Sequence, residues 1–177
     1  AIITTNVAAA ASALVWMLMA SRKGRPSVIG VATGTVVGLV AITPACGFVD
    51  INAACIIGAV GALVSYGCIK LKHRFKLDDT LDVWACHGMA GTWGALATGI
   101  FASKAINPAG ADGLIFGNFH LFQAQVISVS VAWVYAFGMT FVLAKLFNAI
   151  RPLTVSYEAE EVGLDIAQHG EEAYASL

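Results

Sequence analysis

The chain has 177 residues, of which 58% are hydrophobic and 12% are charged, and its formal net charge is −1 at pH 7. Soluble domains carry about 25% charged residues, so the composition excludes an ordinary soluble domain. The sequence also lacks the basic stripe that is typical of nucleic-acid-binding proteins. The apolar residues come in blocks of about 20, the length of a helix that crosses a bilayer. An all-α polytopic membrane protein is therefore predicted, because open sheet edges cannot be satisfied in lipid.

Five apolar segments make residues 1–150 a predicted transmembrane region. In chain order, the expected spans cover about 1–20, 27–49, 53–70, 81–102 and 119–150. The first block lacks a basic start and an initiating Met, so we interpret it as a span rather than a secretory signal, and we expect further spans upstream. The fifth block is longer than a bilayer requires, which predicts a tilted or projecting helix.

The short loops predict the orientation of these spans. Most of the Lys and Arg residues lie in the SRKGR loop (21–25) and the KLKHRFK loop (70–76), whereas the other two connections contain one Lys between them. Lys and Arg favour the cytoplasmic side of a membrane. The first span is therefore expected to run inward, and the fifth is expected to end in the cytoplasm.

Residues 151–177 form a predicted cytoplasmic tail. Its last 21 residues, from Tyr157 on, include six acidic residues and no Lys or Arg. This composition is typical of a solvated, flexible terminus, but it also suits a segment that docks on the basic loops or on a soluble partner. The composition leaves both interpretations open.

Small residues and one proline predict how the helices pack. Glycine recurs every fourth residue from Gly30 to Gly38 and every third residue from Gly88 to Gly94. In lipid, such faces allow close backbone approach between helices. Pro44 removes a backbone donor and predicts a break, or simply the helix end, near the outer end of the second span.

One histidine stands out in the fourth span. No Asp, Glu, Lys or Arg occurs from Val83 to Ser103, yet His87 lies within this stretch. Ionisable groups in membrane spans are costly, usually face a cavity or the bundle interior, and mark substrate or proton paths. A neutral imidazole has one donor and one acceptor nitrogen, so it can accept a proton from a cationic substrate. The alternative is a structural hydrogen bond between helices.

Two carboxylates precede this histidine in the LDDTLD sequence. Asp79 lies eight residues before His87, which is about 12 Å along a helix. Asp79 and Asp82 either place charge at the inner mouth of a passage or cap the helix N-terminus, and both roles can hold together.

The remaining chemistry-bearing residues predict no catalytic or metal centre. The four cysteines have no metal-ligand spacing and are expected to be small buried apolar residues, with a Cys46–Cys55 bond as the alternative. No phosphate loop, nucleophile elbow or paired-carboxylate motif occurs in the sequence. We therefore expect no metal, no cofactor and no enzyme activity. The residues alone predict a membrane channel or transporter with a proton-handling histidine.

Three stretches of the sequence resemble the ammonium transporter family (Amt/Mep/Rh), in particular its microbial Amt branch. They are GLVAITPACGFV (38–49), DDTLDVWACHGMAGTWGALATGIFA (78–102) and GLDIAQHGEEAY (163–174). The resemblance covers essentially the whole chain, as the last five of eleven spans plus the tail. It implies a homotrimer in the cell membrane, with one pore per subunit built from two inverted five-helix repeats and an eleventh oblique helix.

The resemblance also assigns roles to individual residues. His87 matches the second histidine of a pair that faces the pore, and the first histidine is expected upstream. The positions that match pore-lining or supporting residues are Val36, Thr43, Asp79, Asp82 and Val83. Gly163, Leu164 and Asp165 match a regulatory segment that contacts the inner loops and couples to PII-type signalling proteins.

The mechanism implied by the resemblance agrees with the physics of an apolar pore. A bare ammonium ion would suffer a large desolvation cost there, so the family is expected to deprotonate ammonium and conduct ammonia past the histidine pair. The alternative function is that of an ammonium sensor with the same fold and little flux.

Overall fold

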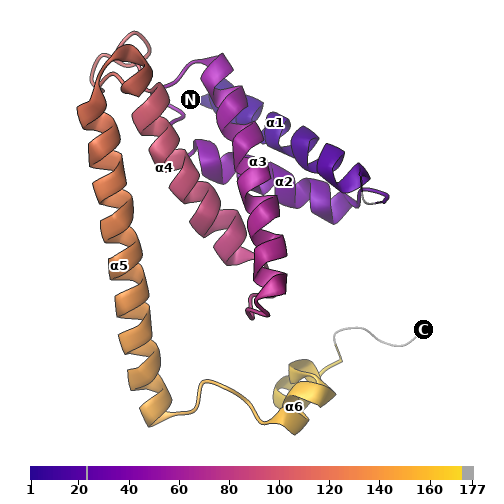
Figure 1. The fold of residues 1–177 in the computed structure, drawn as a ribbon. Coiled ribbons are helices and arrows are strands. Elements are labelled where there is room, and N and C mark those ends of the chain that lie inside the picture. The colour runs from indigo at the N-terminus through magenta and orange to yellow at the C-terminus, as the bar shows by residue number, and fades with distance from the viewer. Residues whose placement is uncertain (23, 173–177) are drawn as a thin grey trace. The chain divides into compact units, whose positions relative to one another are not determined.

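A computed structural model describes residues 1–22 and 24–172 as helices and connecting turns, with no strand in either range (Figure 1). Lys23 of the predicted basic loop and residues 173–177 of the predicted tail lie outside the described residues. The chain forms two compact units, Ala1–Val131 and Ala132–Leu177. Their boundary falls inside the fifth helix, so the proposed division at residue 150 stays a prediction.

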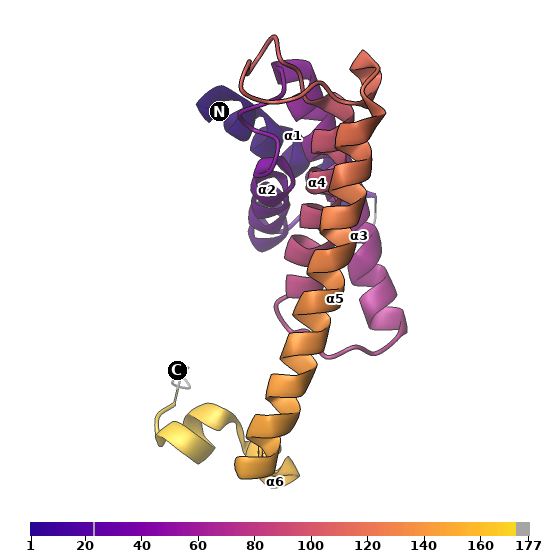
Figure 2. The same ribbon diagram turned by 90° about the vertical axis from the view of Figure 1, so that its left-hand side faces the viewer.

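The first unit is a helical bundle. Its helices are α1 (Ile2–Ser21), α2 (Val28–Ile42), α3 (Ile51–Arg74), the π-helix η1 (Trp84–Met89) with α4 (Ala90–Phe101), the 3₁₀ turn η2 (Leu114–Phe116) and the start of α5 (Phe119–Ile150). Both views show α1 to α4 gathered together (Figure 2). Among the described helices, α1, α3 and α5 are long and apolar enough to cross a membrane.

Two of the expected spans differ in detail from the observed helices. The segment predicted over 27–49 is α-helical only as far as Ile42 and continues in turns, because Pro44 has no N–H to donate to the helix ladder. The segment predicted over 81–102 starts with the π-helical turn of η1 before it continues as α4. A π-helical turn widens the helix locally and is rare.

Close backbone approach holds the bundle together. A Cβ added at Gly38 would lie 2.5 Å from the carbonyl oxygen of Ala8, and one added at Gly58 would collide with the same oxygen. The backbone of α1 therefore touches both α2 and α3 at Ala8. Buried hydroxyls add hydrogen bonds between helices: Ser12 Oγ donates to Gly34 O at 2.5 Å. Such contacts replace the hydrophobic driving force that is missing in lipid.

The second unit contains the remainder of α5, the short helix α6 (Tyr157–Val162) and the π-helical turn η3 (Asp165–His169). Ser156 caps α6, because its hydroxyl accepts the Ala159 N–H at 3.3 Å. Gly163 joins α6 to the next turn at φ 98°, a conformation that glycine adopts at little cost.

Candidate functional site

The predicted pore-lining residues of α2 lie on an exposed strip. Val36 and Thr43 are seven residues apart, which is about two helical turns, and both side chains are exposed on this chain. The Thr43 hydroxyl donates to the Leu39 carbonyl at 2.6 Å, so its polar hydrogen is satisfied within α2. The strip exposes mainly apolar surface, with Val36 at 41% and Leu39 at 39% exposure.

The predicted residues of the fourth span are exposed as well. Val83 precedes the π-helix by one residue and is 51% exposed. His87 lies inside the π-helix, four residues later, and is also exposed. The neighbouring residues Ala85 and Cys86 are buried against the bundle. The turn therefore directs the histidine away from the core formed by this chain.

Contacts between α4 and α2 bring the two exposed segments alongside each other. A Cβ on Gly91 would lie 3.9 Å from Val40, and a Cβ on Gly94 would collide with the Ala41 carbonyl and lie 3.1 Å from Pro44. The order of contacts is the same along both helices, so α2 and α4 run in the same direction here.

The order of these contacts locates the histidine relative to the α2 strip. Gly91 follows His87 by one helical turn, and Val40 follows Val36 by one turn. His87 therefore lies toward the Val36 side of the α2–α4 contact. The exposed residues that the sequence singled out separately therefore lie on two elements that contact each other, α2 and η1.

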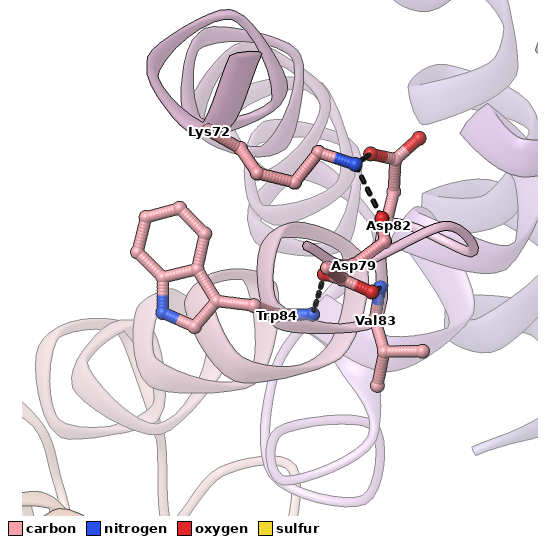
Figure 3. A network of polar contacts seen from close by, with 5 residues as sticks. All are labelled: Lys72, Asp79, Asp82, Val83 and Trp84. Carbon is pink, nitrogen blue, oxygen red and sulfur yellow. Dashed lines mark hydrogen bonds and ion pairs between the residues drawn. The ribbon is translucent and has the colours of Figure 1, made fainter. Parts of the chain in front are cut away.

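Asp79 caps the helix that carries His87 (Figure 3). Its Oδ1 accepts the Val83 N–H and its Oδ2 accepts the Trp84 N–H, both at 2.9 Å. The first N–H groups of a helix have no partner within the helix, and the positive end of its dipole favours a carboxylate. Helix capping was one of the two roles that the sequence predicted for Asp79, and the observed geometry has it.

The same contacts perturb the Asp79 carboxyl group. Partial desolvation raises its pKa, but the N–H donors of Trp84 and Val83 and the charge of Lys72 together outweigh that effect. The net result is a pKa below the ordinary value, because hydrogen bonds to the ionised form favour it.

Lys72 ties this loop to α3. Its Nζ lies 2.6 Å from the buried Oδ1 of Asp82 and also donates to the Asp79 carbonyl oxygen. The Lys72 side chain is only 6% exposed, and a buried ammonium group is tolerated only with such partners. Figure 3 shows Lys72 reaching the turn from the neighbouring helix. Sequence reasoning had counted Lys72 only as one basic residue of an inner loop.

The backbone of the loop adapts to this network. Lys76 and Asp82 have φ values of 52° and 55°, in the left-handed region that side chains other than Asn, Asp and Gly rarely adopt. These two residues bracket the turn that returns the chain from α3 to η1. Asp82 thus supplies both a carboxylate for Lys72 and an unusual backbone geometry at the start of the helix.

The other predicted site residues lie elsewhere. Gly163, Leu164 and Asp165 belong to the second unit, where they connect α6 to η3. All four cysteines are free thiols, so no Cys46–Cys55 bond is formed. In the part of the chain that the structure describes, no group of three His, Cys, Asp or Glu residues is arranged to hold a metal ion.

Three described helices that are long and apolar enough to cross a membrane define the chain as part of a multi-pass membrane protein. The profile of the Ammonium Transporter Family matches residues 1–174. The chain is 44% identical over 174 residues to Ammonium transporter Amt1 of Archaeoglobus fulgidus, and 44% identical over 176 residues to an ammonium transporter of Bacillus subtilis. It therefore belongs to the ammonium transporter family. Each alignment covers 98% of this chain and 44% of the relative, so the chain spans less than half the length of these proteins.

Solved structures agree with this assignment. The crystal structure of Mep2 from Saccharomyces cerevisiae superposes with a TM-score of 0.86 at 35% identity, over 99% of this chain and 42% of that chain. A protein described as a sensor Amt protein gives a TM-score of 0.80 at 30% identity, over 94% and 41% of the two chains. The predicted family and the predicted all-helical transporter fold are confirmed.

Proposed function

We propose that this chain forms part of a conduit that takes up ammonium across the cell membrane, with its C-terminus in the cytoplasm. His87 and a partner histidine, from the part of such a transporter that this chain does not cover, would strip the proton from ammonium, and the neutral ammonia would pass a narrow hydrophobic pore. The observation that supports the proposal is the exposed position of His87 in the turn η1, which contacts α2. In a membrane, an ionisable side chain at such a position faces a cavity or another part of the protein.

The surroundings of His87 support conduction of a neutral species. Val36 and Val83 present apolar surface, and a cation that leaves water for such surface loses its hydration without compensation. A neutral imidazole can accept the proton of the cation at this point. The pore wall would therefore favour ammonia over ammonium beyond the histidine.

The carboxylate charges of Asp79 and Asp82, at the start of the helix that carries His87, are compensated by groups within the protein. Both carboxylate oxygens of Asp79 accept backbone N–H groups, and Asp82 pairs with Lys72. A compensated carboxylate binds a passing cation only weakly. These contacts support a role for Asp79 and Asp82 in holding the pore helix, in preference to a role as free acceptors at its mouth.

Assembly and regulation are part of the proposal. We expect a homotrimer with one pore in each subunit. The turn at Gly163, Leu164 and Asp165 would contact the inner loops and couple transport to a PII-type signalling protein. The unusual backbone conformation of Gly163 supports a defined turn at this point.

The test is methylammonium uptake by the full-length protein in a host that lacks its own ammonium transporters. His87→Ala should lower uptake at least about tenfold, because a positioned acid–base group is lost. His120→Ala is the matched control, since His120 lies at the exposed start of α5 and should leave uptake unchanged. Wild-type rate and selectivity in His87→Ala would remove this histidine from the mechanism.

A second candidate function is ammonium sensing with little flux. The similarity to the sensor Amt protein favours it, because a fold alone does not distinguish transport from signalling. Purified protein in liposomes separates the two functions. A transporter accumulates or releases substrate across the vesicle membrane, whereas a sensor binds ammonium and changes its thermal stability without flux.

A further inference from the structure

A buried hydroxyl on α3 contacts the turn that carries His87. Ser65 is completely buried, and its Oγ donates a hydrogen bond of 2.8 Å to the carbonyl oxygen of Ala85. Ala85 lies two residues before His87 in the same π-helical turn. Serine hydroxyls inside helices often bond to a carbonyl of their own helix, but Ser65 instead reaches a different element.

The π-helical turn changes the hydrogen-bonding pattern at this point. In a continuous α-helix the Ala90 N–H would bond to the carbonyl four residues earlier, but it bonds to the His87 carbonyl instead. A change of register leaves backbone groups that need other partners. The Ser65 hydroxyl supplies such a partner to the Ala85 carbonyl from the α3 side.

The register of this turn determines the direction of His87. One residue corresponds to about 100° of rotation around an α-helix. A π-helical turn accommodates one more residue than an α-helical turn. Relaxation to α-helical geometry would therefore rotate His87 out of its exposed position or displace the residues that Asp79 caps.

We propose that Ser65 is a positioning residue: by holding the Ala85 carbonyl, its hydroxyl keeps the π-helical turn in the register that directs His87 toward the exposed strip. Asp79 fixes the start of this turn and Ser65 fixes its middle. The inference rests on the proposed function, because its readout is transport through His87.

Ser12 offers a matched comparison. It is also completely buried, and its hydroxyl also donates to a carbonyl of a neighbouring helix, Gly34 on α2. That bond joins α1 to α2 and does not involve η1. Ser65→Ala and Ser12→Ala therefore remove the same chemical group from equally buried sites, and only the first affects the turn of His87.

The experiment measures methylammonium uptake by the full-length protein and normalises it to the amount of folded transporter in the membrane. Ser65→Ala should lower the maximal rate per transporter by about threefold to tenfold, the range expected for one lost hydrogen bond, with KM changed less than twofold. Ser12→Ala should change the amount of folded protein but not the rate per transporter. Equal rates per transporter in the two variants would overturn the inference.

An isosteric pair tests the hydroxyl directly. Ser65→Thr keeps the hydroxyl and adds a methyl group, whereas Ser65→Val carries two methyl groups and no hydroxyl. The two side chains have nearly the same shape, so any crowding in the buried site affects both variants. Threonine should restore more transport per molecule than valine, and equal activities would contradict the proposed role. His87→Ala distinguishes the two hypotheses. If His87→Ala leaves uptake unchanged, the proposed function fails. If His87→Ala lowers uptake but the Ser65 variants transport at the wild-type rate, only the positioning role of Ser65 is refuted.

Discussion

Both carboxylate oxygens of Asp79 are bonded to backbone N–H groups where the turn of His87 begins. Asp82, three residues later, pairs with a buried lysine instead. The two aspartates therefore have different structural roles. Asp79 satisfies the free end of a helix, and Asp82 compensates the ammonium group through which α3 holds the loop.

Asp79→Asn should destabilise the protein by about 0.5–1.5 kcal/mol, because the amide keeps only one acceptor oxygen and one of the two backbone N–H groups loses its partner. The pKa of Asp79 is lowered in the folded state, so its stabilising effect is complete above the ordinary value of 3.8 and is lost as the pH falls through the lowered value. Thermal unfolding of the purified protein should show a difference between wild type and Asp79→Asn that is largest at neutral pH and shrinks in acid. Asp78→Asn, at the exposed neighbouring position, should show no such pattern.

Lys72→Met should destabilise the protein by about 1–3 kcal/mol, because it leaves Asp82 without its cation in a partly buried position. The combined variant Lys72→Met with Asp82→Asn removes both charges, so its loss should be smaller than the sum of the two single losses. Unfolding midpoints of the four proteins measure this coupling. Strict additivity would show that the ion pair contributes nothing.

The helices of the first unit associate through small residues. Ala8 of α1 meets glycines on two different helices, and the buried core contains many alanines. At 15 residues, α2 is shorter than a helix that spans a bilayer, which needs about 20 residues. Packing against α1, α3 and α4, rather than length alone, therefore defines the position of α2.

Gly58→Ala tests this packing, because the added Cβ would collide with the Ala8 carbonyl. The backbone cannot give way as a flexible side chain would, and overpacking costs about 1–3 kcal/mol. Gly67→Ala is the control on the same helix, since nothing lies within 4 Å of its added Cβ. Yield of folded protein and thermal stability should fall for Gly58→Ala and should stay the same or rise for Gly67→Ala.

At the scale of the whole molecule, this chain exposes the apolar residues Val36 and Leu39 on α2 and the ionisable residue His87 on η1, which contacts α2. Its relatives are more than twice as long as the region they share with it. We expect the remaining part of such a protein to face this strip and to close the proposed pore. The tail provides a second surface, on which regulation is proposed to act.

Gly163→Ala should alter that regulation. Gly163 has φ 98°, and an added Cβ would lie 2.7 Å from Asp165 Oδ1, so the turn between α6 and η3 would have to change. Gly170→Ala is the comparison, since Gly170 also has a positive φ but nothing lies within 4 Å of its added Cβ. Methylammonium uptake should respond more strongly to Gly163→Ala. Equal uptake and partner binding in the two variants would argue against a regulatory turn.

The class of this protein could be predicted from its sequence. Apolar blocks long enough to cross a bilayer predicted an all-helical membrane protein, because hydrophobicity and length are properties of the segment itself. The stretch that contains His87 pointed to the ammonium transporter family, and the comparisons confirm it. The position of the histidine within a charge-free segment was visible without any structure.

The surroundings of that histidine were decided by tertiary structure alone. Lys72 looked like one basic loop residue among several, but it is buried because the loop folds back and presents Asp82 and the Asp79 carbonyl. The π-helical turn has no hydrophobic period that would reveal it, and its bond to Ser65 joins residues twenty positions apart. A sequence pattern records which residues share a face, whereas hydrogen-bond register depends on partners that only folding brings together.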